Sequence, residues 1–355
     1  MYLSTADFLY VISSTLIGIF GFGLNLYLLY LINFKSPSYL SPYTIFLGNT
    51  ALTQMIYSIL LIMTVPRVIS LNFYIVNIYL GPSQYLGHWW SYMFFGLMIG
   101  MGVNSFISIM LSMIFRCVVL TASHFPKSLA YAMCLGGALI PTTMTISLWD
   151  IKCSHDPKEN ERFTNGAVKH LENYKVIVGC DITQPSIMLD IFCASLLLIP
   201  VYGVMYYCRW RILRFIDRPT TCISSSVTYN NVRRLVRALT VQSIVPLFTI
   251  FPASLAYTTT QFGLLQTDAY SYFIISALSS SCCIDPIVTI FYVLPFRRFT
   301  LLLFKGYDEE RVSLYSGDRS RSRSRSSFIS GKRSASVNSK LVTRARLVSG
   351  PTNSF

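Results

Sequence analysis

The sequence predicts an all-α membrane protein built as a bundle of seven transmembrane helices. Hydrophobic residues make up 53% of the 355-residue chain and charged residues only 12%, about half the charged share of a soluble domain. Seven uninterrupted apolar segments reach the roughly 20 residues that a helix needs to cross a bilayer. These segments lack the alternation of membrane barrel strands, and backbone groups in lipid must be satisfied internally, so helices are expected.

The seven predicted spans contain no Lys or Arg. They are residues 8–33, 43–66, 89–115, 128–149, 186–208, 238–257 and 269–294. The first lacks a basic flank and is too long for a cleaved signal peptide, so it is read as a signal anchor that stays. Residues 68–80 are also uncharged but too few to span. We expect them at the interface or in the first outer loop.

The distribution of Lys and Arg predicts the orientation, because cytoplasmic loops carry an excess of both. With the amino terminus outside, 14 basic residues of the loops and the membrane-proximal tail lie in the cytoplasm and six lie outside. The net charge of +14 then reflects segments that face the bilayer's anionic lipids. It does not indicate a nucleic-acid partner.

Residues 305–355 form a predicted cytoplasmic tail of different composition. Arg and Ser alternate from Arg319 to Ser326, a low-complexity pattern typical of disorder. RNA-binding proteins carry similar repeats. After seven spans, however, we favour a basic tail near anionic lipid whose charge serine phosphorylation would cancel.

The longest loop before the tail, residues 150–185, holds the two cysteines that this orientation places outside. In an oxidising compartment Cys153 and Cys180 could close a disulfide. The alternative is two free thiols. No metal site or cofactor is predicted.

Polar and ionisable groups inside the spans are functional candidates. The candidates for interhelical contacts or switching are Asn25, Asn49, Asn104, Arg116, Pro246, Asp285 and Pro286. The asparagines can bridge neighbouring helices. Asp285 must be paired, hydrated or protonated in lipid, and the adjacent Pro286 permits a bend. Arg116 ends the third span, where it can also act as an interfacial anchor.

Three stretches resemble the rhodopsin-like G-protein-coupled receptor plan, and more closely the nematode serpentine chemoreceptors. They are residues 41–51 with Gln54, residues 79–82, which point to class delta, and residues 285–298, which look like the seventh-span motif running into an amphipathic helix. The likeness covers about residues 8–304. The sequence departs from it at Ser83, where a cysteine is expected, and at residues 115–117, which read Phe-Arg-Cys in place of Asp-Arg-Tyr.

The resemblance implies a chemosensory, olfactory-type receptor that detects a small-molecule or pheromone-like ligand and activates a heterotrimeric G-protein. It also implies a multi-pass protein of the plasma membrane, in a sensory cilium. Residues expected towards the outer side, as ligand contacts, are Trp89, Trp90, Met93, Asp190, Tyr257 and Tyr272. Basic residues expected to border an inner G-protein cleft are Arg116, Arg233, Arg234, Arg237, Arg297 and Arg298.

A membrane transporter or a ligand-gated channel is the alternative function. Coupled carriers usually show several intramembrane acids or an internal repeat, whereas this sequence has one central acid and an odd number of spans. Seven-helix odorant channels have the opposite orientation. An enzyme is not expected, because the spans hold no paired-Asp, Ser-Lys or His-rich constellation.

Overall fold

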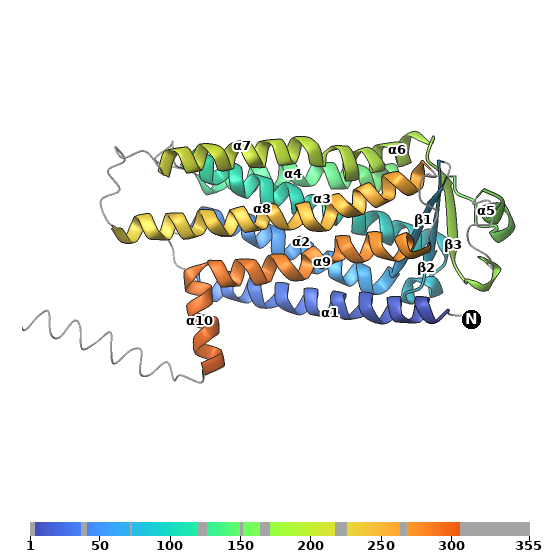
Figure 1. Ribbon diagram of the computed structural model, residues 1–355, viewed down its shortest axis with the longest axis horizontal. Coiled ribbons are helices and arrows are strands. Elements are labelled where there is room, and N and C mark those ends of the chain that lie inside the picture. The colour runs from blue at the N-terminus through green and yellow to red at the C-terminus, as the bar shows by residue number, and fades with distance from the viewer. Residues whose placement is uncertain are drawn as a thin grey trace, which may run out of the picture. The chain divides into compact units, whose positions relative to one another are not determined.

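Long helices run side by side in the computed structural model (Figure 1), which describes residues 4–36, 41–71, 73–119, 126–149, 152–163, 171–216, 226–262 and 268–305. The bundle helices are α1 (Thr5–Phe34), α2 (Ser41–Thr64), α3 (His88–Val119), α4 (Lys127–Ser147), α7 (Leu198–Ile216), α8 (Ser226–Gln261) and α9 (Asp268–Tyr292). The short helix α6 (Pro185–Ile191) and a π-helical turn, Phe192–Leu196, lead into α7. These helices confirm the predicted seven-helix bundle.

Six helical segments of the described chain are long and apolar enough to cross a membrane on composition alone. The sixth predicted span, residues 238–257, lies within α8, which is not one of these six. It nevertheless belongs to the bundle, because α8 packs against α9 and α7. Its length of 36 residues exceeds the roughly 20 that a bilayer requires. The basic first part of α8 therefore extends beyond the predicted span.

A three-stranded antiparallel sheet covers one end of the bundle, which we call the sheet end (Figure 1). Its strands, in spatial order, are β1 (Pro66–Leu71), β2 (Tyr74–Tyr79) and β3 (Ile177–Asp181). Segment 68–80, expected at the interface or in a loop, thus contributes to two paired strands, β1 and β2, and no strand was predicted here. The segment is rich in the β-branched and aromatic residues that favour strands. Most of its apolar residues are buried between the bundle and the long loop, although Phe73 at the turn is exposed.

The loop between α4 and α6 supplies the third strand of the sheet. It also contains α5 (Pro157–Phe163) and a 3₁₀ turn at Leu171–Asn173. Cys153 and Cys180 form a disulfide with their Cα atoms 4.6 Å apart. The bond ties the start of this loop to β3, and Cys180 pairs across the sheet with Ile75 of β2.

Replacing Cys153 and Cys180 together by Ser should lower the free energy of unfolding by about 2–4 kcal/mol, because the closed loop restricts the unfolded chain. The two cysteines are 27 positions apart. Thermal unfolding of the purified protein in detergent, with and without reductant, measures the effect. Reductant should lower the melting temperature of the wild type and leave that of the double variant unchanged. An equal reductant effect on both would contradict the prediction.

The chain from Met1 to Arg298 is one compact unit, and residues from Phe299 onward belong to a second. The expected helix after the seventh span is α10 (Leu294–Lys305). Phe296 is fully buried in it, while Arg297 and Arg298 are exposed. The predicted disordered tail, residues 305–355, lies outside the described residues except for Lys305, the last residue of α10.

Candidate functional site

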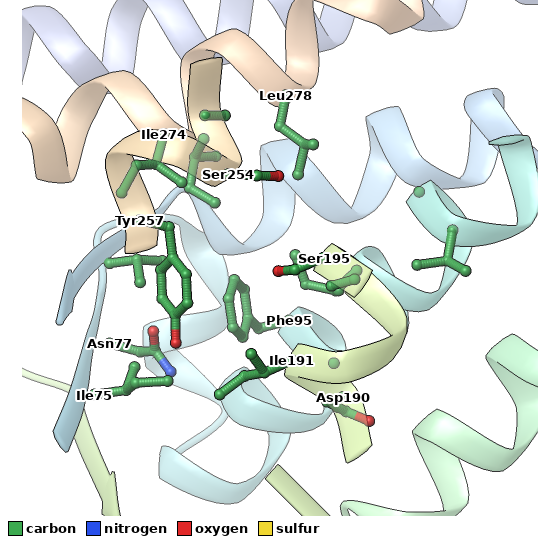
Figure 2. A pocket seen from close by; sticks show the side chains of 18 of the residues that line it. Ile75, Asn77, Phe95, Asp190, Ile191, Ser195, Ser254, Tyr257, Ile274 and Leu278 are labelled. Atoms are coloured by element: carbon green, nitrogen blue, oxygen red, sulfur yellow. The ribbon is translucent and has the colours of Figure 1, made fainter. Parts of the chain in front are cut away.

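A cavity of about 170 Å³ lies inside the bundle beneath the sheet. Its walls come from α3, the α6–α7 segment, α8 and α9, and its roof from the sheet (Figure 2). Val68 of β1 and Asn77 of β2, which face each other across the hairpin, both line it. Most other lining side chains are apolar: Ile75, Phe95, Ile99, Val103, Phe106, Ile187, Ile191, Ile250, Ile274, Ile275 and Leu278.

Within the part of the chain that the structure describes, three polar atoms on the cavity wall are buried without a hydrogen-bond partner. They are Asn77 Oδ1, Tyr257 Oη and Asp190 Oδ1. Asn77 is only 3% exposed. Buried polar groups in folded proteins are nearly always hydrogen-bonded, to protein, water or ligand. Such atoms on a cavity wall are therefore candidates for ligand contacts.

The roof of the cavity is held by a buried ion pair next to it. Arg67 of β1 lies 3.3 Å from Asp7 of α1, and their side chains are 4% and 0% exposed. Arg67 also donates to Ser271 of α9 at 2.9 Å, and its guanidinium lies 4.3 Å from the ring centre of Tyr272. Tyr272 donates to Asp7 at 2.7 Å. The hairpin is thus tied to both α1 and α9.

Tyr174, from the long loop, completes this cluster. Its hydroxyl donates to Asp7 at 2.8 Å and accepts from Arg67 at 3.3 Å. Burial raises the pKa of Tyr174 to about 12, and the hydrogen bond to Asp7 acts in the same direction. The phenol therefore stays protonated at neutral pH and remains a donor to the carboxylate.

A second polar network lies deeper in the bundle. Gln54 of α2 donates both to Asp285 of α9, at 2.7 Å, and to Ser105 of α3, at 3.0 Å. Asn25 of α1 donates to the Cys282 carbonyl of α9 at 3.0 Å. Four helices are thereby joined by side-chain hydrogen bonds, which stabilise helix association inside a bilayer.

Two more asparagines connect α2 with α3. Asn49 donates to Ser108, and Asn104 donates to Thr53 at 3.0 Å. Together with Asn25 and Asp285, these residues were selected from the sequence as interhelical candidates, and the structure brings all four into hydrogen bonds between helices. Pro286 lies within α9 beside Asp285. Pro246 lies in α8, where its side chain is outside the described residues.

Arg116 lies near the end of α3, away from the sheet. It is 7% exposed, and its guanidinium lies 3.9 Å from the ring centre of Tyr43 of α2. Its side chain is therefore packed between helices in this structure instead of lining an open surface. Arg233, Arg234 and Arg237 lie in the first part of α8, but their side chains are outside the described residues.

Of the six expected ligand contacts, Asp190 and Tyr257 line the cavity. Trp89 and Trp90 do not, because they are 40% and 50% exposed at the start of α3 and Trp89 packs edge-on against Trp149. Exposed aromatics at a helix end are typical of interfacial anchors.

The other two expected contacts are also absent from the cavity wall. Met93 is buried but lies outside the lining set. Tyr272 is engaged by Asp7 and Arg67. Sequence reasoning selected it from its depth in the span, which does not determine the direction of a side chain.

Three residues at or beside the cavity were not predicted from the sequence: Asn77, Asp7 and Arg67. Asn72 and Asn77 are the two asparagines of the uncharged segment 68–80. If the segment had been predicted as a hairpin, Asn77 would have been placed on one face of a strand. Asp7 and Arg67 each stand at the end of an apolar run. Nothing in their spacing indicates that the two meet.

The seven-helix bundle places the protein in the structural class of rhodopsin-like receptors. Its fold is similar to the crystal structure of squid rhodopsin, with a TM-score of 0.61 and 16% identity, over 88% of this chain and 91% of that one. Identity at that level supports the fold alone.

The family follows from closer similarities. The family described as "Serpentine type 7TM GPCR chemoreceptor Srd" matches residues 10–302. Serpentine receptor class delta-32 of Caenorhabditis elegans is 47% identical, over 88% of this chain and 92% of its own. Serpentine receptor class delta-33, from the same organism, is 42% identical over 85% and 88%. The chain belongs to this serpentine chemoreceptor family, and it is a multi-pass membrane protein, as the sequence predicted.

Proposed function

We propose that the protein is a chemosensory receptor that binds a small molecule in the cavity beneath the sheet and activates a heterotrimeric G-protein at the opposite end. The cavity is the observation that carries the proposal. It is mainly apolar and lined by helices from distant parts of the chain, and three of its polar atoms have no hydrogen-bond partner in the described structure. Pockets of this kind typically bind small organic ligands.

The proposed orientation has the sheet end and the amino terminus outside the cell. It is supported by the excess of basic residues in the segments at the other end. It also agrees with the disulfide at the sheet end, since disulfides persist in oxidising compartments. The proposed location is the plasma membrane, in a sensory cilium as the family resemblance implies.

Signalling would require that ligand binding shifts an equilibrium between two arrangements of the helices. Gln54 and Asp285 lie between the cavity and the Arg116 end of the bundle, and they join α2, α3 and α9. We propose that this network repacks when the receptor is activated. The G-protein cleft would then be bordered by Arg116, Arg297, Arg298 and the basic part of α8.

The test is to record G-protein activation and membrane current together in cells that express the protein, across a panel of small odorants. An active compound should raise G-protein activation without current. Current that persists when no G-protein is present would instead support the alternative, a channel or transporter.

Ligand-evoked activation should survive Asp190→Asn and be reduced at least about tenfold by Arg116→Ala. Asp190→Asn keeps the size of the side chain, whereas Arg116→Ala removes the packing of a buried guanidinium on Tyr43, and a desolvated cation–π contact is worth about 2 kcal/mol. Dose–response curves normalised to surface expression measure both. The proposal for Arg116 fails if both variants respond like the wild type.

A further inference from the structure

The chemistry of the cavity wall restricts the class of ligand, given the proposed function on which this inference rests. Among the described lining residues there is no Lys, Arg or His. An anionic ligand would therefore lose its hydration without gaining a charged partner, and burying an unpaired charge is costly. The apolar side chains that form most of the wall favour an apolar body.

Two neutral polar groups line this mainly apolar cavity from different elements. Asn77 reaches the cavity from β2 and Tyr257 from α8. Figure 2 shows the Tyr257 hydroxyl pointing toward the Asn77 side chain. Asn77 Oδ1 and the Tyr257 hydroxyl are both buried and have no hydrogen-bond partner among the described residues. A ligand hydroxyl between them would donate to Asn77 and accept from Tyr257, which satisfies both groups at once.

Asp190 is the one carboxylate of the described lining, and it could in principle select a cation. It enters from α6, and its carboxylate points away from Asn77 and Tyr257 in Figure 2. The ionisable and polar groups that face it are Tyr92 of α3, Ser147 of α4 and Cys193 of the π-helical turn. Asp190 therefore lies apart from the pair that would hold the polar end of a ligand.

The volume sets the size of the ligand. The cavity measures about 170 Å³, while an engineered apolar cavity of about 150 Å³ holds one benzene molecule. One ring or a short chain with a single polar substituent fills such a space.

We propose that the cavity selects a small, neutral, mainly apolar alcohol, whose hydroxyl is held between Asn77 and Tyr257. A carbonyl compound of the same size satisfies only Tyr257, and a hydrocarbon satisfies neither group. The expected order of affinity is alcohol, then aldehyde, then hydrocarbon. Each unmatched buried polar group weakens binding by about tenfold.

The test uses the full-length protein in lipid nanodiscs and five compounds of similar size: benzyl alcohol, benzaldehyde, ethylbenzene, benzylamine and benzoate. Ligand-induced shifts of the melting temperature, titrated for each compound, give relative affinities. Benzyl alcohol should bind most tightly, about tenfold better than benzaldehyde and about a hundredfold better than ethylbenzene. Benzoate should not bind.

Two variants test whether Tyr257 and Asn77 cause the preference for the alcohol. Tyr257→Phe and Asn77→Leu should each reduce the advantage of benzyl alcohol over ethylbenzene by about tenfold, with ethylbenzene binding unchanged or improved. Tyr202→Phe is the matched control, because the Tyr202 hydroxyl is also buried with no hydrogen-bond partner in the described part of the chain but does not line the cavity. It should leave the order unchanged. Retained ethylbenzene binding shows that each variant is folded.

The proposal is overturned if none of the five compounds binds, if ethylbenzene equals the alcohol, or if Tyr257→Phe and Asn77→Leu keep the wild-type order. Tightest binding of benzylamine, abolished by Asp190→Asn, would overturn it in favour of a cation site. Parallel recording of G-protein activation separates the two proposals. Binding of the alcohol that depends on Asn77, without activation, would refute the receptor mechanism and leave the ligand class standing.

Discussion

Arg67→Ala should lower the free energy of unfolding by about 3–5 kcal/mol, the cost of removing one partner from a buried ion pair. Asp7 is fully buried, so its carboxylate would stay buried without a cation. The variant also removes the hydrogen bond to Ser271 and the contact with the Tyr272 ring. Melting temperature in detergent and surface expression in cells measure the loss.

The same variant should weaken ligand binding, because Arg67 holds the strand that roofs the cavity. Val68, the next residue, lines the cavity directly. The matched control is Lys175→Ala, since Lys175 is exposed and its ammonium lies 4.0 Å from the ring centre of Tyr85. That change should cost no more than about 1 kcal/mol. Equal effects of the two variants would show that the Asp7–Arg67 pair does not anchor the hairpin.

A double variant tests whether the loss of stability comes from the Asp7 carboxylate that is left buried without its partner. Asp7→Asn with Arg67→Met removes both charges and keeps the volumes close to those of the wild type. Replacing a buried ion pair by neutral groups is often close to neutral in stability. The double variant should therefore be more stable than Arg67→Ala alone, and a double-mutant cycle gives the coupling between the two residues.

Gln54→Leu should lower the free energy of unfolding by about 3 kcal/mol, the cost of leaving a buried carboxyl group, that of Asp285, without its hydrogen bond. Within the described chain, Gln54 donates to Asp285 Oδ2, while Asp285 Oδ1 is buried without a partner. The substitution would leave the whole carboxyl group unsatisfied and would also break the bond to Ser105. Thermal unfolding and surface expression report the effect.

The control for this prediction is Asp285→Asn, whose amide oxygen still accepts the hydrogen bond from Gln54. It should cost less than about 1 kcal/mol. Adding Asp285→Leu to Gln54→Leu should recover part of the lost stability, since an apolar pair leaves no unsatisfied carboxyl group. If Gln54→Leu is as stable as the wild type, the network has no structural role.

The spans could be predicted because the requirement they meet is local. A helix in lipid needs about 20 apolar residues regardless of what surrounds it, and the first predicted span, 8–33, differs from α1 by three residues or fewer at either end. The interhelical role of Asn25, Asn49 and Asp285 could be predicted for a related reason. A polar group in lipid must find a partner, and neighbouring helices supply it.

The site could be predicted only in part, because a cavity depends on the direction of side chains from several elements. Of the residues selected as ligand contacts by their depth along a span, Tyr257 and Asp190 line the cavity, whereas Trp89 and Tyr272 face elsewhere. Asn77 was missed because the hairpin that carries it was read as an interfacial segment or a loop. Short apolar segments do not by themselves distinguish a strand from a helix or loop.

The sequence by itself determined that this protein is a seven-helix membrane protein of the serpentine chemoreceptor family, because hydrophobic length and motif order are properties of the linear chain. Only the tertiary structure decided how the sheet covers one end of the bundle, that Asp7 contacts Arg67, and that Asn77 and Tyr257 line one apolar cavity. Asp7 and Arg67 are 60 positions apart. Contacts of that kind arise from how helices and strands pack, and the spacing of residues along the chain does not encode them.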